Sequence, residues 1–324
     1  MGDITRWGAA GEKYKIHPET LEYFQILEEQ GSRPVATLTV EEARQSSLDR
    51  AEQFAGNIDF DGTTEEYICP SPYSTEGIHL DVYTPSDYKS SSSILVYFHG
   101  GGLVIGSRRT VETLCKIIAR DASCIVVNVE YRMGPEHRVP ACFQDAKLVL
   151  RWVNLNKGRF GALNSSKLGV MGDSGGGQIA AAVCYDVKGI DYQVLIYPMT
   201  DMTCSLPSFS EFLETPGLNQ SSIDWFMENS LKTDKQKRDS SCNPGQQISQ
   251  YNLPPALIVS AQLDPLRDCS YVYNQKLREA GVESSTVLIR GAPHGFYNLP
   301  GFFEELCTEA NGHVIKFIKR FHNS

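Results

Sequence analysis

The sequence predicts an α/β protein with a mostly parallel central sheet, helices on both faces of that sheet, and a helical cap. Two observations lead to this prediction. Short, continuous apolar runs alternate along the chain with longer segments of helical spacing, as expected for buried parallel strands joined by crossover helices. One long polar stretch, residues 201–250, shows no strand pattern. Because long structureless insertions are rare in compact domains, we interpret this stretch as cap helices above the sheet's carboxyl edge.

The first 56 residues are expected to be helical and to contribute to the cap. Pro18 suits the first position of a helix whose apolar stripe ends near Gly31. Thr39 followed by Glu42 has the pattern of a capping box, and this predicts a second helix that ends before residue 56. The domain organisation that we expect is therefore N-terminal cap helices at 1–56, core at 57–200, cap insertion at 201–250 and core again at 251–324.

The core strands and helices follow in alternation. Alternating patterns at 65–70 and 78–83, joined by a turn over 72–77, predict two half-buried strands. Continuous apolar runs predict six buried strands, at 93–98, 124–129, 168–171, 194–198, 256–260 and 286–289. Helical spacing predicts the helices between and after them, at 110–122, 140–154, 177–183, 269–279 and 303–321.

Composition and charge exclude several classes of function. The chain has 324 residues and a net charge of −9, so it lacks the basic footprint that nucleic-acid binding requires. Its nine cysteines form no C-x-x-C pair, which argues against a zinc or redox site and favours a reducing, cytoplasmic location. The first six residues do not form a signal peptide. No apolar run approaches 18 residues, so we expect no stable membrane insertion.

Ser174 is the candidate nucleophile. It lies between an apolar strand and a small-residue helix, with Gly172 and Gly176 two positions before and after it. A strand that turns sharply into a helix presents the residue at its apex, and side chains at the two flanking positions would collide with neighbouring backbone. The G-x-S-x-G pattern alone is a weak signal, so its context has to support it.

A serine nucleophile needs a base and a group that orients the base, in the chain order Ser, Asp or Glu, His for this topology. His294 follows the last predicted strand and precedes the terminal helix, whereas His313 and His322 lie in or beyond that helix. Asp264, at the end of a predicted strand, is the expected orienting acid. Asp268 is the rival carboxylate, and its alternative role is to cap the helix that follows.

Glycines supply the candidate oxyanion donors. His99-Gly100-Gly101-Gly102 leaves a predicted strand, and bare glycine N–H groups can approach a substrate oxygen closely. We assign Gly101, Gly102 and Gly175 as the donors, and Gly100 to the same oxyanion hole for its geometry. The competing interpretation is a nucleotide-phosphate loop. Neither glycine run matches the dinucleotide or Walker pattern, and this argues against that alternative.

Five segments together match the pattern of one known group of enzymes. They are HGGG at 99–102, YRMGPEHRVPA at 131–141, GDSGGG at 172–177, DPLRD at 264–268 and HGF at 294–296. On these residues the chain resembles the hormone-sensitive-lipase-like branch of the α/β hydrolases, which includes bacterial short-chain carboxylesterases and arylacetamide deacetylase. The resemblance implies the α/β-hydrolase fold and hydrolysis of short- to medium-chain carboxylic esters through an acyl-enzyme on the serine. It implies a helical cap and no cofactor or metal.

The chain departs from that family's pattern at a few positions. Gly175 stands where alanine is usual, Gln178 where asparagine is common, and Leu103 where phenylalanine or tryptophan is usual, which is expected to widen the site. None of these changes removes a catalytic atom. The expected partner is a small-molecule ester, and a homodimer is left open. Two alternatives remain: an amide or formamide hydrolase on the same fold, and a non-catalytic small-molecule receptor of hydrolase ancestry.

Overall fold

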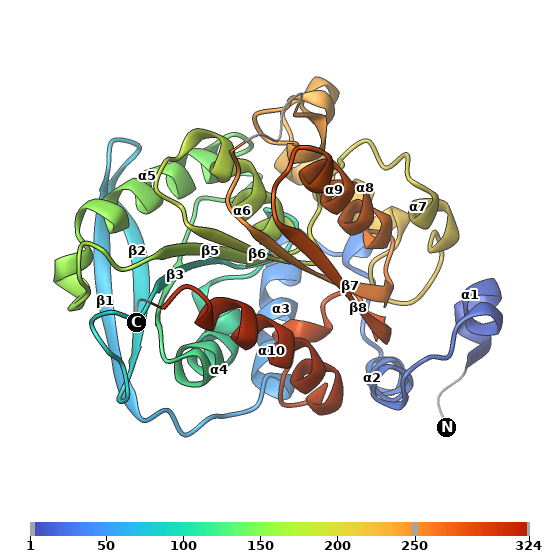
Figure 1. Cartoon of the computed structure of the whole chain (residues 1–324). Helices are drawn as coiled ribbons and strands as arrows, with labels where there is room; N and C mark the ends of the chain where they lie inside the picture. Colours follow the sequence, from blue (N-terminus) through green and yellow to red (C-terminus); the bar gives the residue numbers. More distant parts are fainter. Residues whose placement is uncertain (1–3, 248–251, 323–324) are drawn as a thin grey trace.

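The computed structural model of the protein describes residues 4–247 and 252–322 (Figure 1). At its centre is one sheet with the strand order β1-β2-β4-β3-β5-β6-β7-β8. The strands are β1 (Gly62–Ser71), β2 (Ser74–Pro85), β3 (Ile94–Phe98), β4 (Ile125–Val129), β5 (Leu168–Asp173), β6 (Tyr192–Ile196), β7 (Ala256–Leu263) and β8 (Ser284–Pro293).

The predicted, mostly parallel sheet is confirmed. β1 and β2 form an antiparallel hairpin, and β2 pairs antiparallel with β4. The other neighbouring strands, in the order β4, β3, β5, β6, β7 and β8, are parallel to one another. The hairpin turn is shorter than predicted, because residues 74–77 already belong to β2. β8 is longer than predicted, because it pairs with β7 from Ser284 to Pro293. The carboxyl ends of β5, β7 and β8 therefore meet at one edge of the sheet.

Helices cover both faces of the sheet (Figure 1). One face carries α4 (Glu112–Ala122) and α10 (Glu304–Lys319), and the other carries α5 (Ala141–Leu155), α6 (Gly175–Asp186) and α9 (Arg267–Glu279). Short 3₁₀ turns occur at η3 (Arg108–Val111), η4 (Lys157–Phe160) and η7 (Phe296–Asn298), and two more, η5 (Asp234–Arg238) and η6 (Pro244–Gln246), lie between β6 and β7.

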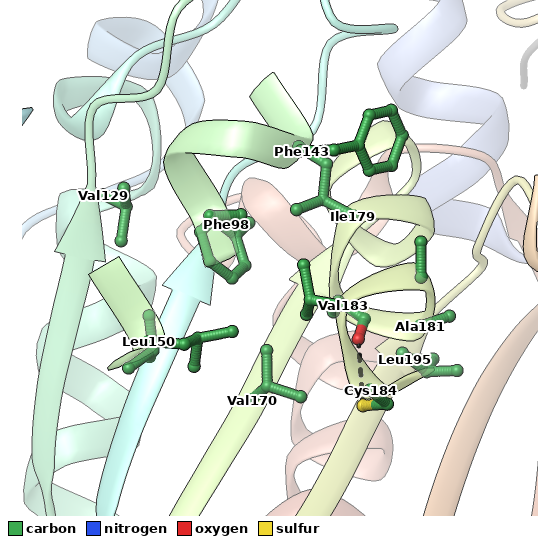
Figure 2. Close-up of a cluster of buried hydrophobic side chains, with 14 of the residues drawn as sticks. Phe98, Val129, Phe143, Leu150, Val170, Ile179, Ala181, Val183, Cys184 and Leu195 are labelled. Carbon is green, nitrogen blue, oxygen red and sulfur yellow. Dashed lines mark hydrogen bonds between the residues drawn. The ribbon is translucent and has the colours of Figure 1, made fainter. Parts of the chain in front are cut away.

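Figure 2 shows the core between the sheet and the helices α5 and α6. Side chains from four neighbouring strands meet side chains from the two helices, and all of them are buried. They are Phe98, Val129, Val170 and Leu195 from the sheet, and Phe143, Leu150, Ile179 and Val183 from the helices. Full burial of one such side chain contributes about 1.5–3 kcal/mol to folding. Small residues at 180–182 let α6 pack closely on the sheet, which places its N-terminus firmly at the carboxyl edge.

The remaining elements are N-terminal, or lie between β6 and β7. They are η1 (Ile4–Trp7), α1 (Gly8–Lys13), α2 (Pro18–Glu29), η2 (Val35–Thr37), α3 (Val40–Phe54), α7 (Pro207–Glu211) and α8 (Gln220–Ser230). Both sequence signals for the N-terminal helices are confirmed: Pro18 is the first residue of α2, and Thr39 and Glu42 form the capping box of α3. Residues 1–3 and 248–251 of the expected segments, and 323–324, lie outside the described residues.

Hydrogen bonds join the N-terminal segment to the segment between β6 and β7. The indole N–H of Trp225 in α8 donates to the Leu38 carbonyl oxygen at 3.2 Å, next to η2. The Tyr14 hydroxyl donates to the Glu211 carboxylate of α7 at 2.7 Å. Two segments that are far apart in the sequence are thus held together by directed polar contacts.

The described part of the chain contains no helix with the length and apolarity required to cross a membrane. All nine cysteines lie in that part and are free thiols, and eight of them are buried. Burial raises the pKa of these thiols, for example to about 12 at Cys69 and Cys124. The cysteines therefore act as small, unreactive core residues.

Candidate active site

Ser174 occupies the turn between β5 and α6 in a strained conformation, with φ 52° and ψ −118°. A non-glycine residue held in such a sparsely populated region costs about 1–3 kcal/mol, and the surrounding structure must enforce it. Three backbone hydrogen bonds do so: Ser174 N–H donates to Ile196 O at 2.9 Å, and Ser174 O accepts from Gln178 N–H at 3.0 Å and from Met199 N–H at 3.3 Å. The serine hydroxyl is thereby presented at the carboxyl edge of the sheet.

The two flanking glycines are required by close backbone approach, as the sequence predicts. A β-carbon on Gly172 would lie 2.3 Å from the carbonyl oxygen of Gly176. A β-carbon on Gly176 would lie 2.0 Å from the carbonyl oxygen of Phe98 in β3. Real carbon–oxygen contacts do not approach so closely, so any side chain at either position would displace the turn.

The structure brings Ser174, His294 and Asp264 together in one hydrogen-bonded chain. His294 follows β8 and Asp264 follows β7, which places both at the same edge of the sheet as the serine. His294 Nδ1 lies 2.7 Å from Asp264 Oδ2, and His294 Nε2 lies 2.9 Å from Ser174 Oγ. Because a carboxylate can only accept, Nδ1 carries the proton and Nε2 is free to accept from the serine hydroxyl.

Buried neighbours hold this chain of three side chains. Asp264 is fully buried, and its second oxygen accepts from Leu266 N–H at 2.8 Å. The Tyr197 ring lies 4.6 Å from the His294 ring, centroid to centroid, and packs against it at the end of β6. The imidazole is therefore fixed by the carboxylate on one side and by an aromatic face on another. Sequence inspection did not single out Tyr197, because it is one aromatic residue in an apolar run.

Asp268 is neither the acid that orients His294 nor the cap of the following helix, which were the two roles considered for it. It does not contact His294, and it is not the cap of α9, because that helix already begins at Arg267. Its Oδ2 accepts from Ser208 N–H at 2.9 Å, and its Oδ1 lies 3.0 Å from the Arg267 guanidinium. The expected cap is corrected: Asp268 joins the first turn of α9 to α7.

The predicted oxyanion glycines meet beside the serine, although one of them is not a free donor. A β-carbon on Gly175 would lie 3.3 Å from both N and Cα of Gly102, so these two residues are immediate neighbours. No acceptor engages the N–H groups of Gly101, Gly102 or Gly175 within the described residues. The Gly100 N–H instead donates to Asp173 Oδ1 at 2.8 Å. Gly100 therefore supplies geometry, and the available donor set is Gly101, Gly102 and Gly175.

Asp173, next to the candidate nucleophile, links three parts of the site. Its Oδ1 accepts from the Tyr97 hydroxyl at 2.8 Å and from Gly100 N–H, and its Oδ2 accepts from Asn298 Nδ2 at 2.6 Å. Burial raises the pKa of this carboxyl, and the hydrogen bonds from Asn298 and Tyr97 act in the opposite direction. The sequence showed Asp173 only as the variable position before the serine, because its partners are 73 to 125 residues away.

Replacing Asp173 with alanine is expected to lower kcat by about 10², because the loop that bears the oxyanion donors loses its anchor. Asp173→Asn should lose far less. Its carbonyl can still accept from Tyr97 and Gly100, and the Asn298 amide, whose oxygen has no other partner in the described structure, can turn to accept from the new amide. Steady-state kinetics and thermal unfolding of both variants check this. Equal losses in the two variants would show that the charge of Asp173 is required.

A cavity of about 500 Å³ opens over Ser174 and His294. Its lining comes from the oxyanion loop, from α8 and from the N-terminal helices, with Leu103, Ile223, Phe226 and Met227 among its apolar residues. This volume is typical of a small-molecule site. In the described part of the chain, no cluster of three or more His, Cys, Asp or Glu side chains is arranged to hold a metal ion.

A mostly parallel sheet with a strained serine at its edge, and an imidazole and a carboxylate in line with it, defines a hydrolase of the α/β type. The chain belongs to the alpha/beta hydrolase fold family, whose sequence profile matches residues 95–298.

Individual relatives span most of the chain. An ethyl acetate hydrolase of Pseudomonas putida is 31% identical over 90% of this chain and 94% of its own length. The carboxylesterase NlhH of Mycobacterium tuberculosis is 34% identical over 75% of this chain and 78% of its own length. Among solved structures, an alpha/beta hydrolase enzyme from the metagenome of Lake Arreo has a TM-score of 0.86 at 30% identity, covering 94% of this chain and 98% of that one.

Proposed function

We propose that this protein is a serine carboxylesterase that hydrolyses short- to medium-chain esters through an acyl-enzyme on Ser174. The observation that carries the proposal is the in-line arrangement of Ser174 Oγ, the His294 ring and Asp264, with 2.9 Å and 2.7 Å between the interacting atoms. Relatives named as an ethyl acetate hydrolase and a carboxylesterase support ester hydrolysis as the activity.

In acylation, His294 Nε2 takes the proton of the Ser174 hydroxyl as Oγ forms a bond to the ester carbonyl carbon. The carbonyl oxygen becomes an oxyanion, which the N–H groups of Gly101, Gly102 and Gly175 stabilise. When the carbon–oxygen bond to the alcohol breaks, His294 returns the proton to the leaving oxygen. Asp264 keeps Nδ1 protonated and stabilises the imidazolium that forms in between.

In deacylation, water takes the place of the alcohol. His294 Nε2 accepts a proton from the water as its oxygen attacks the acyl carbon, and the same N–H groups hold the second oxyanion. Cleavage of the bond to Ser174 Oγ releases the carboxylic acid, and His294 returns the proton to the serine. The cycle needs no cofactor, since each proton and electron pair is transferred between named side chains, the substrate and water.

We further propose that residues 1–56 and 201–250 together form the cap over this site. The contact of Trp225 with Leu38, and of Tyr14 with Glu211, support a joint cap, and both segments contribute to the lining of the cavity. Leu103 lines the same cavity, where it leaves more room than an aromatic residue would. A cavity of about 500 Å³ favours small acyl groups over long lipid chains.

A cytoplasmic location is also part of this proposal, since the nine cysteines are free thiols. The substrate is a small-molecule ester in solution, and the protein does not insert stably into a membrane. Sedimentation velocity of the purified protein distinguishes a monomer from the homodimer that the sequence leaves open.

The proposal is tested with p-nitrophenyl acetate, butyrate, octanoate and palmitate, and with butyryl p-nitroanilide as the matched amide. We expect kcat/KM to be greatest among the short and medium esters, to fall sharply at palmitate, and to be lower for the anilide than for the butyrate ester. A faster rate with the anilide would favour an amide hydrolase. No turnover of any substrate, together with no labelling by a fluorophosphonate, would favour a receptor.

A further inference from the structure

Within the described residues, one arginine that lines the cavity over Ser174 forms no ion pair with a carboxylate. Three arginines line the cavity. Arg6 pairs with Glu28 at 2.8 Å and Arg33 pairs with Glu42 at 3.1 Å. Arg50 of α3 has no carboxylate oxygen within 4.0 Å among the residues that the structure describes. An exposed arginine without a partner is ordinary, but Arg50 is partly buried in a cavity that also contains the nucleophile.

The neighbour of Arg50 is neutral. Its guanidinium lies beside the Tyr23 hydroxyl, where it acts to lower the pKa of that group. Burial has the larger effect and leaves the pKa of Tyr23 raised, so the phenol stays protonated and supplies no negative charge. The acidic residues that line the cavity do not pair with Arg50. Glu28 forms an ion pair with Arg6, Glu214 is exposed, and Asp173 is buried and accepts hydrogen bonds from Tyr97 and Asn298.

The part of α3 near Arg50 leaves room for a ligand. The other residues of this helix that line the cavity are small, and two of them carry hydroxyl groups: Ala43, Ser46, Ser47 and Ala51. The serines lie three and four positions before Arg50, so they share its face of the helix. A group bound at the guanidinium would find additional donors one turn away.

Arg44 fixes the position of α3 relative to the oxyanion loop. Its guanidinium donates to Val104 O at 3.0 Å and to Gly134 O at 2.8 Å, and so it ties the helix to the loop that bears the oxyanion donors. Arg50 lies six positions further along, which corresponds to about 9 Å of helix. Arg50 and Ser174 line the same cavity, and Arg50 makes none of the contacts that join Ser174, His294 and Asp264.

We infer that Arg50 binds an anionic group of the substrate, so that the preferred esters carry a carboxylate several bonds from the scissile carbonyl. This inference rests on the proposed esterase function and names its substrate class. A carboxylate can form two parallel, charge-assisted hydrogen bonds with a guanidinium. The net charge of −9 makes the protein repel anions at long range, so such a preference must come from a local contact.

The test compares mono-p-nitrophenyl adipate with its neutral isostere, the adipamate ester, and with p-nitrophenyl hexanoate. A charged hydrogen bond of this kind should favour the anionic ester over the adipamate by about 10- to 100-fold in kcat/KM. Because Arg50 belongs neither to the chain of Ser174, His294 and Asp264 nor to the oxyanion donors, the difference should appear mainly in KM. The pair 4-acetoxybenzoate and 4-acetoxybenzamide tests a carboxylate on the alcohol side in the same way.

Arg50→Met should abolish the preference for the anionic ester, and Arg50→Lys should retain part of it. Arg109→Met is the matched control. Arg109 pairs at 3.3 Å with Glu52, which lies in the same helix as Arg50, and Arg109 does not line the cavity. If the wild-type protein hydrolyses hexanoate yet shows no preference for either anionic ester, or if the preference survives Arg50→Met in a folded variant, the inference is wrong. No hydrolysis of hexanoate would instead refute the esterase function.

Discussion

Ser174→Ala is expected to reduce kcat for p-nitrophenyl butyrate by about 10⁶, close to the loss found when the nucleophile of a serine hydrolase is removed. The variant has no oxygen to form the acyl-enzyme, and the imidazole and oxyanion donors can provide only the small residual catalysis that binding supports. Labelling by a fluorophosphonate should be lost together with turnover, because both require the same hydroxyl.

Ser260→Ala serves as the control for this loss. Ser260 is buried in β7, and its hydroxyl has no hydrogen-bond partner in the described structure, so its removal should change neither activity nor folding appreciably. Thermal unfolding should confirm that the Ser174 variant is folded. If the Ser174→Ala variant kept more than about one hundredth of the wild-type kcat, an acyl-enzyme on Ser174 would no longer explain the activity.

Asp264→Asn is expected to lower kcat by about 10⁴ with little change in KM. The asparagine amide can donate to Nδ1, and this would favour the tautomer that has its proton on Nε2. In that tautomer the ring cannot accept the Ser174 proton. The geometry would remain, since the side chain keeps its size and its oxygen can still accept from Leu266 N–H. Steady-state kinetics and the rate of fluorophosphonate labelling should both show the loss.

Asp268→Asn is the matched control, because Asp268 is the rival carboxylate in the same segment. It contacts Ser208 and Arg267 and not His294, so its substitution should weaken the packing of α7 on α9 and lower the unfolding temperature, with kcat altered much less. Should Asp268→Asn lose more activity than Asp264→Asn, the assignment of the orienting acid would have to be reversed.

Much of this architecture follows from local patterns. Pro18 and the pair Thr39 and Glu42 define helix starts by stereochemistry and hydrogen bonding within one turn, so the structure reproduces them. Gly172 and Gly176 were expected from the sharpness of the turn at Ser174, and the contacts that a β-carbon would make confirm the reason.

The features that sequence inspection missed depend on partners far away in the chain. Asp173 draws its hydrogen bonds from Tyr97, Gly100 and Asn298, and nothing next to Asp173 indicates them. The same carboxylate removes Gly100 from the set of free donors. Asp268 was expected to cap a helix because carboxylates commonly do so, but the start of α9 at Arg267 and the approach of Ser208 give it another role.

Patterns in the sequence were enough to predict the alternation of strands and helices, the glycine-flanked serine, and the acid and histidine that follow it in the required order. These depend on spacing and on the conformational limits of single residues, which are encoded locally. The hydrogen bonds of Asp173, the role of Asp268 and the absence of a carboxylate partner for Arg50 among the described residues became visible only in the folded chain. Those outcomes depend on distances between distant segments, since a hydrogen bond or ion pair forms only where packing brings its partners within a few ångströms.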